Sequence, residues 1–297
     1  MDQDAAVVRQ QDFECDGPIG VVVELGAGKL DVHLVEGGRT VAVQVRPDST
    51  EASPWTAGIA GLLSWLGEQA GSGAPGELGT EAVRRTRIEF EGERLVVQTP
   101  KDLPLRTVPL VVTVTAPAGS TLTARSGSAD VTVDGVSGRL ELATGSGDVR
   151  AQRCEGPAEV RTGSGGVRIG SVVGALRVRT GSGVVEVISL EGTGTVQTGS
   201  GDVRLGAVSD DLSARTGSGD LTIADAAGGR LELSTGSGQL RVGIHSGVLA
   251  EIDVSSGSGA ARSELPVGGP PADGTAAALR LRGRTGSGDA LVTTAGS

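Results

Sequence analysis

Residues 140–150 read LELATGSGDVR, and variants of this stretch recur along the chain. The first glycine of the Thr-Gly-Ser-Gly motif or its variants falls at Gly127, Gly145, Gly163, Gly181, Gly199, Gly217, Gly236, Gly257 and Gly286. The first five intervals between these glycines are equal, and the last three are progressively longer. A fixed period near 20 residues is typical of a solenoid, in which each repeat packs on the next.

Apolar residues stand at fixed offsets from this glycine and alternate with polar ones. The position four residues after it holds Val149, Val167, Val185, Val203, Leu221 and Leu240. The position three residues before it holds Leu142, Val160, Val178, Val196, Ala214, Leu233 and Val254. Alternation with period two predicts strands with one buried face. We therefore predict an all-β fold, a parallel β-solenoid (β-helix) with 18-residue two-strand coils, in which the valines form one interior file.

Two further positions of the repeat predict how its corners are built. A threonine column has the parity of the buried positions, so we expect it to line the corner of the core and to bond backbone groups. It contains Thr144, Thr162, Thr180, Thr198, Thr216, Thr235 and Thr285. The glycines of the turn are expected to supply backbone angles that other residues resist. Cys154 occupies an apolar column and is expected to be a buried small hydrophobe.

The N-terminal third predicts a β cap with one inserted helix. Strands are expected at 21–25, 29–34 and 40–45, and a hairpin at 87–90 and 94–99. Trp55, Ile59, Leu62, Leu63 and Leu66 fall on one helical stripe within 54–70. That helix would cap or flank the solenoid, or dock on a partner or a membrane surface. We predict a cap region at 1–110 with this insert and a linker at 71–80, and solenoid repeats at 111–297, with loops near 226–229, 243–248 and 264–275.

Composition limits the function. The 297 residues carry a net charge of −10 and few aromatic side chains, which disfavours nucleic-acid binding. The segment 1–16 does not resemble a signal peptide, and no apolar stretch is long enough to predict a membrane span. Cys15 and Cys154 are far apart in the sequence and indicate neither a disulfide framework nor a zinc site. A soluble cytoplasmic protein is the simplest expectation.

The residues favour none of three kinds of site chemistry: phosphate binding, calcium binding and polysaccharide cleavage. The glycine-rich turns lack the Lys-Ser/Thr ending of a phosphate-binding loop and precede strands. Asp148, Asp202, Asp220 and Asp289 are similar to calcium β-roll ligands, but the same column holds Gly166, Val184, Gln239 and Ala260. No carboxylate pair or Ser-His-Asp arrangement indicates polysaccharide cleavage, and His33 and His245 belong to different regions. We therefore predict that the protein is not an enzyme and binds neither a cofactor nor a metal.

Arginines at outward positions of the predicted strands form two rows. One row holds Arg161, Arg179 and Arg215, and the other holds Arg150, Arg168 and Arg204 and continues to Arg241 and Arg262. The rows alternate with Asp and Glu. They are either solvated faces or a flat docking face for a protein or an acidic polymer. The first six arginines are the candidate interaction residues.

The repeated run 140–150, the turn at 26–28 with the strand after it, and the strand at 95–97 resemble a bacterial β-strand-repeat family of unknown function whose members are known as putative adhesins. The resemblance covers most of the chain, except for the insert at 54–70. It implies the solenoid fold, and the family name implies adhesion.

We expect a non-catalytic scaffold or protein-interaction module that binds a protein partner or associates with itself. One alternative is a structural filament formed by end-to-end stacking of solenoids. Another alternative is an adhesin-like or glycan-binding surface protein.

Overall fold

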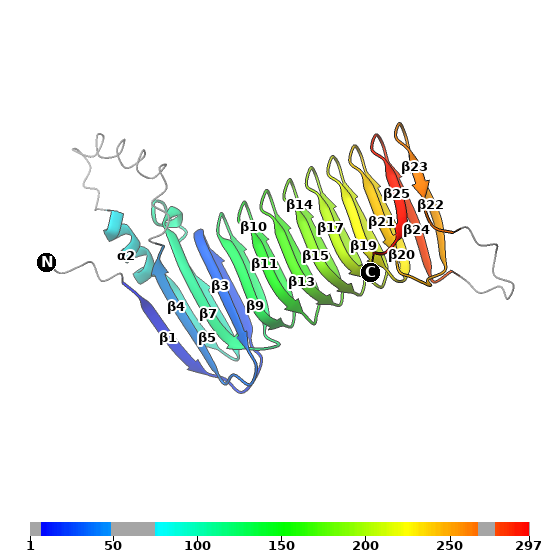
Figure 1. Ribbon diagram of the computed structural model, residues 1–297. Helices are drawn as coiled ribbons and strands as arrows, with labels where there is room; N and C mark the ends of the chain where they lie inside the picture. The colour runs from blue at the N-terminus through cyan, green and yellow to red at the C-terminus, as the bar shows by residue number, and fades with distance from the viewer. Residues whose placement is uncertain (1–6, 49–74, 267–276, 297) are drawn as a thin grey trace, which may run out of the picture.

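The computed structural model describes residues 7–48, 75–266 and 277–296, which form a flattened rod of two facing β-sheets (Figure 1). The 13-stranded sheet is called sheet A and the 12-stranded one sheet B. Each coil gives one strand to each sheet, and the aliphatic core lies between them. The predicted all-β solenoid is confirmed.

The central coils stack in parallel and in register. In sheet B these strands are β8 (Thr121–Ser126), β10 (Leu140–Thr144), β12 (Ala158–Thr162), β14 (Leu176–Thr180), β16 (Gly194–Thr198) and β18 (Leu212–Thr216). In sheet A they are β9 (Asp130–Ser137), β11 (Val149–Cys154), β13 (Val167–Val173), β15 (Val185–Glu191), β17 (Val203–Val208) and β19 (Leu221–Ala226). Val149 pairs with Val167, Val167 with Val185, and Val185 with Val203, and all four are fully buried. The predicted interior file is confirmed.

The N-terminal end is part of the same stack, threaded out of sequence order. The coil of β2 (Gly20–Leu25) and β3 (Ala27–Val35) lies between the coil of β6 (Arg94–Gln98) and β7 (Pro109–Pro117) and the coil of β8 and β9. Antiparallel strands close this end: β4 (Thr40–Pro47) on β7, β1 (Arg9–Glu14) on β4, and β5 (Arg87–Glu91) on β6. The expected strands are present, but the expected boundary at residue 110 falls inside β7.

A helix that the sequence analysis missed packs at this end. Helix α2 (Pro75–Arg85) contacts β4 and the 3₁₀ helix η1 (Leu105–Thr107), and its Ala82 and Val83 are fully buried. The linker predicted for 71–80 is therefore wrong over residues 75–80. The helix buries only a short apolar stretch, which left little periodicity to detect. The helix predicted at 54–70 lies outside the described residues.

The C-terminal end repeats the threading of the N-terminal end in mirror order. Strand β24 (Leu279–Thr285) lies between β20 (Gly229–Thr235) and β22 (Ala250–Ser256). Strand β25 (Ala290–Thr294) lies between β21 (Leu240–Ile244) and β23 (Ala261–Ser263). The last coil of the chain is thus internal, and the coil of β22 and β23 is outermost (Figure 1). The last two intervals between turn glycines are the longest, and they belong to this out-of-order part of the chain.

Within the described ranges, the single α-helix is too short and too polar to cross a bilayer.

Candidate functional site

The threonine column connects each turn to the preceding coil of the stack through side-chain hydrogen bonds. These threonines are 2–8% exposed, and each Oγ1 accepts a hydrogen bond of 3.0–3.1 Å from the amide of the second turn glycine. Six of the seven hydroxyls also donate to a carbonyl of the neighbouring coil, as Thr216 does to Gly201 at 3.0 Å. The predicted role of the column is confirmed. It fixes the relative position of successive coils, and with it the spacing of the surface side chains.

The turn glycines are required for close stacking, which corrects the expectation about backbone angles. Neither Gly181 nor Gly183, nor their equivalents in the other central coils, has a φ in the left-handed region. A Cβ on Gly183 would lie 1.8 Å from the carbonyl oxygen of Gly165 in the coil below. One on Gly181 would lie 2.4 Å from the carbonyl oxygen of Gly163. Contacts this short leave no room for a side chain.

The aspartates that follow the turns bind backbone amides of the next coil. Asp148 Oδ1 accepts from the amide of Gly166 at 2.8 Å, and Asp220 Oδ1 accepts from that of Gln239 at 2.8 Å. Asp202 accepts from the amide of Asp220 and also pairs with Arg204 at 2.7 Å. Their oxygens are thus engaged in holding the stack. In the described part of the chain, no three His, Cys, Asp or Glu side chains converge as a metal site would require.

The six candidate arginines are divided between the two sheets, on opposite faces of the rod. Arg150, Arg168 and Arg204 project from sheet A, whereas Arg161, Arg179 and Arg215 project from sheet B. They therefore cannot form one docking surface. Because strand pairing decides which sheet a residue joins, the repeat alone did not separate the two rows spatially.

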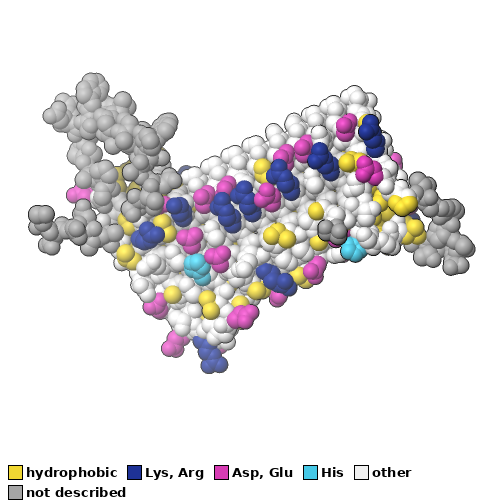
Figure 2. Space-filling view, viewed as in Figure 1, with side chains coloured by type: hydrophobic (Ala, Val, Ile, Leu, Met, Phe, Trp, Pro, Cys, Tyr) yellow, Lys and Arg dark blue, Asp and Glu magenta, His cyan; other side chains and the backbone are white. Residues whose placement is uncertain are grey.

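The sheet A arginines lie in a row of alternating charge, which crosses the face seen in Figure 2. Arg168 pairs with Glu186 at 2.9 Å, Arg204 pairs with Glu186 at 3.3 Å, and Arg150 pairs with Asp148 at 3.0 Å. These cations already have anionic neighbours. This row fits the interpretation of a solvated, internally compensated face.

The outer face of sheet B carries more arginines than that of sheet A, and most of them have no anionic partner. Arg161 pairs with Glu159, and Arg125 pairs with Glu141 at 3.5 Å. No ion pair within the described residues involves the exposed Arg139, Arg177, Arg179, Arg215 or Arg230. Arg125, Arg139, Arg177 and Arg230 were not predicted as site residues. They occupy outward positions two, four or six residues before the turn glycine, and an alignment of the repeats on that glycine identifies these positions.

Charge is therefore segregated between the two faces of the solenoid. From residue 121 onward, the outer face of sheet B carries ten arginines and six carboxylates, which are Arg125, Arg139, Arg161, Arg177, Arg179, Arg215, Arg230, Arg280, Arg282 and Arg284 with Glu141, Glu159, Asp211, Glu232, Glu251 and Asp253. Sheet A and its turns carry six arginines and twelve described carboxylates. A chain of net charge −10 thus has one basic face, called the sheet B face below.

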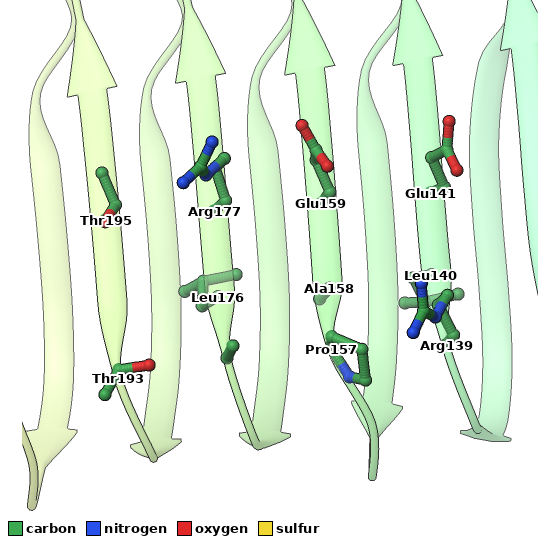
Figure 3. A pocket seen from close by; sticks show the side chains of 11 residues that line it. Arg139, Leu140, Glu141, Pro157, Ala158, Glu159, Leu176, Arg177, Thr193 and Thr195 are labelled. Atoms are coloured by element: carbon green, nitrogen blue, oxygen red, sulfur yellow. The ribbon is translucent and has the colours of Figure 1, made fainter.

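A shallow depression of about 250 Å³ lies on the sheet B face across β10, β12, β14 and β16 (Figure 3). Arg139 and Arg177 line it together with Glu141, Glu159 and the hydroxyl-bearing Thr193 and Thr195. Its remaining lining is small or aliphatic: Leu140, Pro157, Ala158, Ala175 and Leu176. A second depression, lined by Arg125, Arg161 and Arg179, lies at the turn end of β8, β10, β12 and β14.

The remaining chemically notable side chains are dispersed. His33 lies 3.4 Å from Asp134 near the N-terminal end, and His245 lies 3.0 Å from Asp225 near the other end. Cys154 is fully buried, as predicted, with its Sγ 3.0 Å from the carbonyl oxygen of Gly138. These groups do not meet at one place.

The fold and its two charged faces define a solenoid repeat protein with extended flat surfaces. The chain belongs to the Toastrack DUF4097 family, whose model matches residues 90–265. The resemblance inferred from the repeats is thereby confirmed.

Several solved structures resemble this chain over nearly its whole length at low sequence identity. A putative adhesin from Bacteroides fragilis shares 10% identity at a TM-score of 0.42, with 96% of this chain and 97% of that chain covered. A putative lipid binding protein from Parabacteroides distasonis shares 10% identity at a TM-score of 0.42, with 98% of both chains covered. No curated protein matched the chain.

Proposed function

We propose that the protein is a non-catalytic interaction scaffold that uses the sheet B face to bind a macromolecular partner with an acidic surface. The observation that carries the proposal is the charge segregation, which concentrates unpaired arginines on one face of an acidic chain. Arginine suits this role because its planar guanidinium binds carboxylates through two hydrogen bonds and keeps its charge at any physiological pH.

The rigid stack supports this proposal. The threonine and aspartate bonds connect adjacent coils, so the arginines project from a backbone of fixed spacing. A preorganised row of charges loses little conformational freedom when a partner binds, and several weak contacts then act together.

Two variants of identical net charge test the proposal. R161Q/R179Q/R215Q removes three charges from the sheet B face, and R150Q/R168Q/R204Q removes three from sheet A. The proteins and polysaccharides captured from the source cells should depend on the first set and not on the second. Equal capture by both variants and the unaltered chain would rule out the sheet B face as the binding surface.

End-to-end assembly is the second candidate, because among the described residues no strand pairs with the outer side of β22 or β23. Strands β22 and β23 are the edges of the described sheets, and a depression of about 810 Å³ there is lined by Ile252, Val254 and Leu265. The outward Glu251 and Asp253 of β22 pair with Arg280 and Arg282, and Glu89 of β5 pairs with Arg87, so most of the carboxylates at the two ends already have cationic partners. Light scattering at high protein concentration tests this candidate: a strict monomer excludes it.

The third candidate, a surface adhesin, is supported by the names of the similar structures alone. The cytoplasmic location expected from the sequence is also a proposal. Cell fractionation with an antibody against the protein separates the two.

A further inference from the structure

We propose that the partner of the sheet B face is an acidic polysaccharide that lies along the rod. The depression over β10, β12, β14 and β16 would bind one of its sugar units. This inference rests on the proposed function, since it names the chemical class that the basic face binds. Three features of the face lead to it: the spacing of its charges, a lining that can bond hydroxyl groups, and the lack of aromatic and large apolar anchors.

The arginine spacing matches a polymer of moderate charge density. Arg125, Arg161, Arg179 and Arg215 occupy one outward row, on strands β8, β12, β14 and β18. With neighbouring strands about 4.8 Å apart, successive arginines of the row are about 5–10 Å apart. A nucleic-acid strand carries a charge about every 3.4 Å, which is denser than this row. A polysaccharide with one carboxylate per sugar or per disaccharide has a charge spacing closer to that of the arginine row.

The lining of the depression favours a ligand that bears hydroxyl groups as well as carboxylates. Glu141 and Glu159 stand beside Arg139 and Arg177, and Thr193 and Thr195 complete the wall (Figure 3). Glutamate carboxylates accept hydrogen bonds from sugar hydroxyls, and threonine hydroxyls both donate and accept. Each unit of an acidic sugar polymer presents hydroxyl groups as well as a carboxylate, whereas a phosphate chain presents no hydroxyl donors to these glutamates. The mixture of cations, carboxylates and hydroxyls therefore fits an acidic sugar better than a polyphosphate.

The face lacks aromatic and large apolar anchors. The large apolar side chains exposed in the described residues are Val8, Val35, Leu103, Ile188 and Leu249, and none projects outward from a strand of sheet B. Binding hot spots between proteins are enriched in buried Trp, Tyr and Arg, and of these three the sheet B face offers arginine alone. A surface of arginine, threonine and small residues instead supports charge-dominated, salt-sensitive binding spread over several coils.

The test measures binding of purified full-length protein to polygalacturonate by calorimetry at low and moderate salt. We expect binding that weakens as salt rises, and no binding to fully methyl-esterified polygalacturonate, which has the same backbone without charge. The R139Q/R177Q/R179Q variant should bind about tenfold more weakly or worse. The R150Q/R168Q/R204Q variant, of equal net charge, should stay within about twofold of the unaltered chain. Circular dichroism and melting curves verify that both variants fold.

A second pair of measurements separates sugar recognition from plain charge attraction. T193V/T195V keeps the charge and the strand preference of the face, so it should weaken polygalacturonate binding several-fold and leave binding of inorganic polyphosphate unchanged. If polyphosphate or poly-L-glutamate binds as tightly as polygalacturonate, the polysaccharide assignment fails, while the scaffold proposal survives through its dependence on sheet B arginines. If no polymer binds, the assignment also fails, and the cell-capture experiment then decides the scaffold proposal on its own.

Discussion

The substitution Thr180→Val tests whether the threonine column stabilises the stack. Valine has nearly the same shape as threonine and suits a strand, but it cannot form hydrogen bonds. In the native protein, Thr180 Oγ1 accepts from the amide of Gly183 at 3.1 Å, and its hydroxyl faces the carbonyl of Gly165 at 3.5 Å. The side chain is 8% exposed and Gly183 is buried, so water cannot replace the lost partner.

Leaving a buried amide without a partner costs about 1–3 kcal/mol. For a chain of this size, each kcal/mol lowers the melting temperature by about 2 °C, so we expect a drop of about 2–6 °C. Because the Thr180–Gly165 contact is long, its loss adds little to this free energy. Calorimetry or thermal circular dichroism measures the drop, and amide exchange at Gly183 should rise.

The matched control is Thr222→Val. Thr222 lies on the outer face of β19 and makes no side-chain hydrogen bond within the described residues, so the change should stay within about 0.5 kcal/mol. If the two variants melt at the same temperature as the unaltered protein, the bonds of the threonine column do not stabilise the stack, and the reasoning is wrong.

The remaining predictions concern the turns and the ends of the rod. Gly183→Ala should destabilise the protein by about 3 kcal/mol or prevent folding, because the added Cβ would lie 1.8 Å from the carbonyl oxygen of Gly165. The control Gly17→Ala, which has open space around it, should be neutral, and denaturant unfolding measures the stability of both variants. Asp220→Ala should lose about 1 kcal/mol through its bond to the Gln239 amide, whereas Asp220→Asn keeps an acceptor oxygen and should lose less than half of that; equal losses would contradict the amide-binding role. Hydrogen exchange followed by mass spectrometry should show stronger protection for residues 279–294 than for 250–263, because the last coil of the chain is flanked on both sides; the opposite order would refute the threading.

Local periodicity was sufficient to predict the interior of the rod. Val149, Val167, Val185 and Val203 recur at one position of the repeat, so their burial in one file follows from the repeat itself. The same periodicity predicted the threonine column and the buried Cys154. Gly194 interrupts an apolar column because Leu190 and Leu212 fill the space, with terminal carbons 2.7 Å from where its Cβ would lie. That exception depends on two neighbours that no local pattern identifies.

The candidate site was predicted only in part. The outward position of Arg161, Arg179 and Arg215 followed from alternation, but their separation from Arg150, Arg168 and Arg204 required the sheets. Arg139 and Arg177 stand at outward positions of the repeat, but the depression that they line forms from residues of different coils that meet only after stacking. Ion pairing likewise depends on which coils become neighbours.

The order of the repeats along the chain does not determine their order in space at the two ends. Every coil buries a similar aliphatic row, so several stacking orders satisfy the hydrophobic pattern equally well. The repeat therefore determined by itself the strands, the core and the outward columns of this protein. Only the tertiary structure decided that the coils of β2–β3 and β24–β25 lie inside their neighbours, and that the unpaired arginines gather on one face. Long-range strand pairing and loop connections made these choices, because neither has a local counterpart in the sequence.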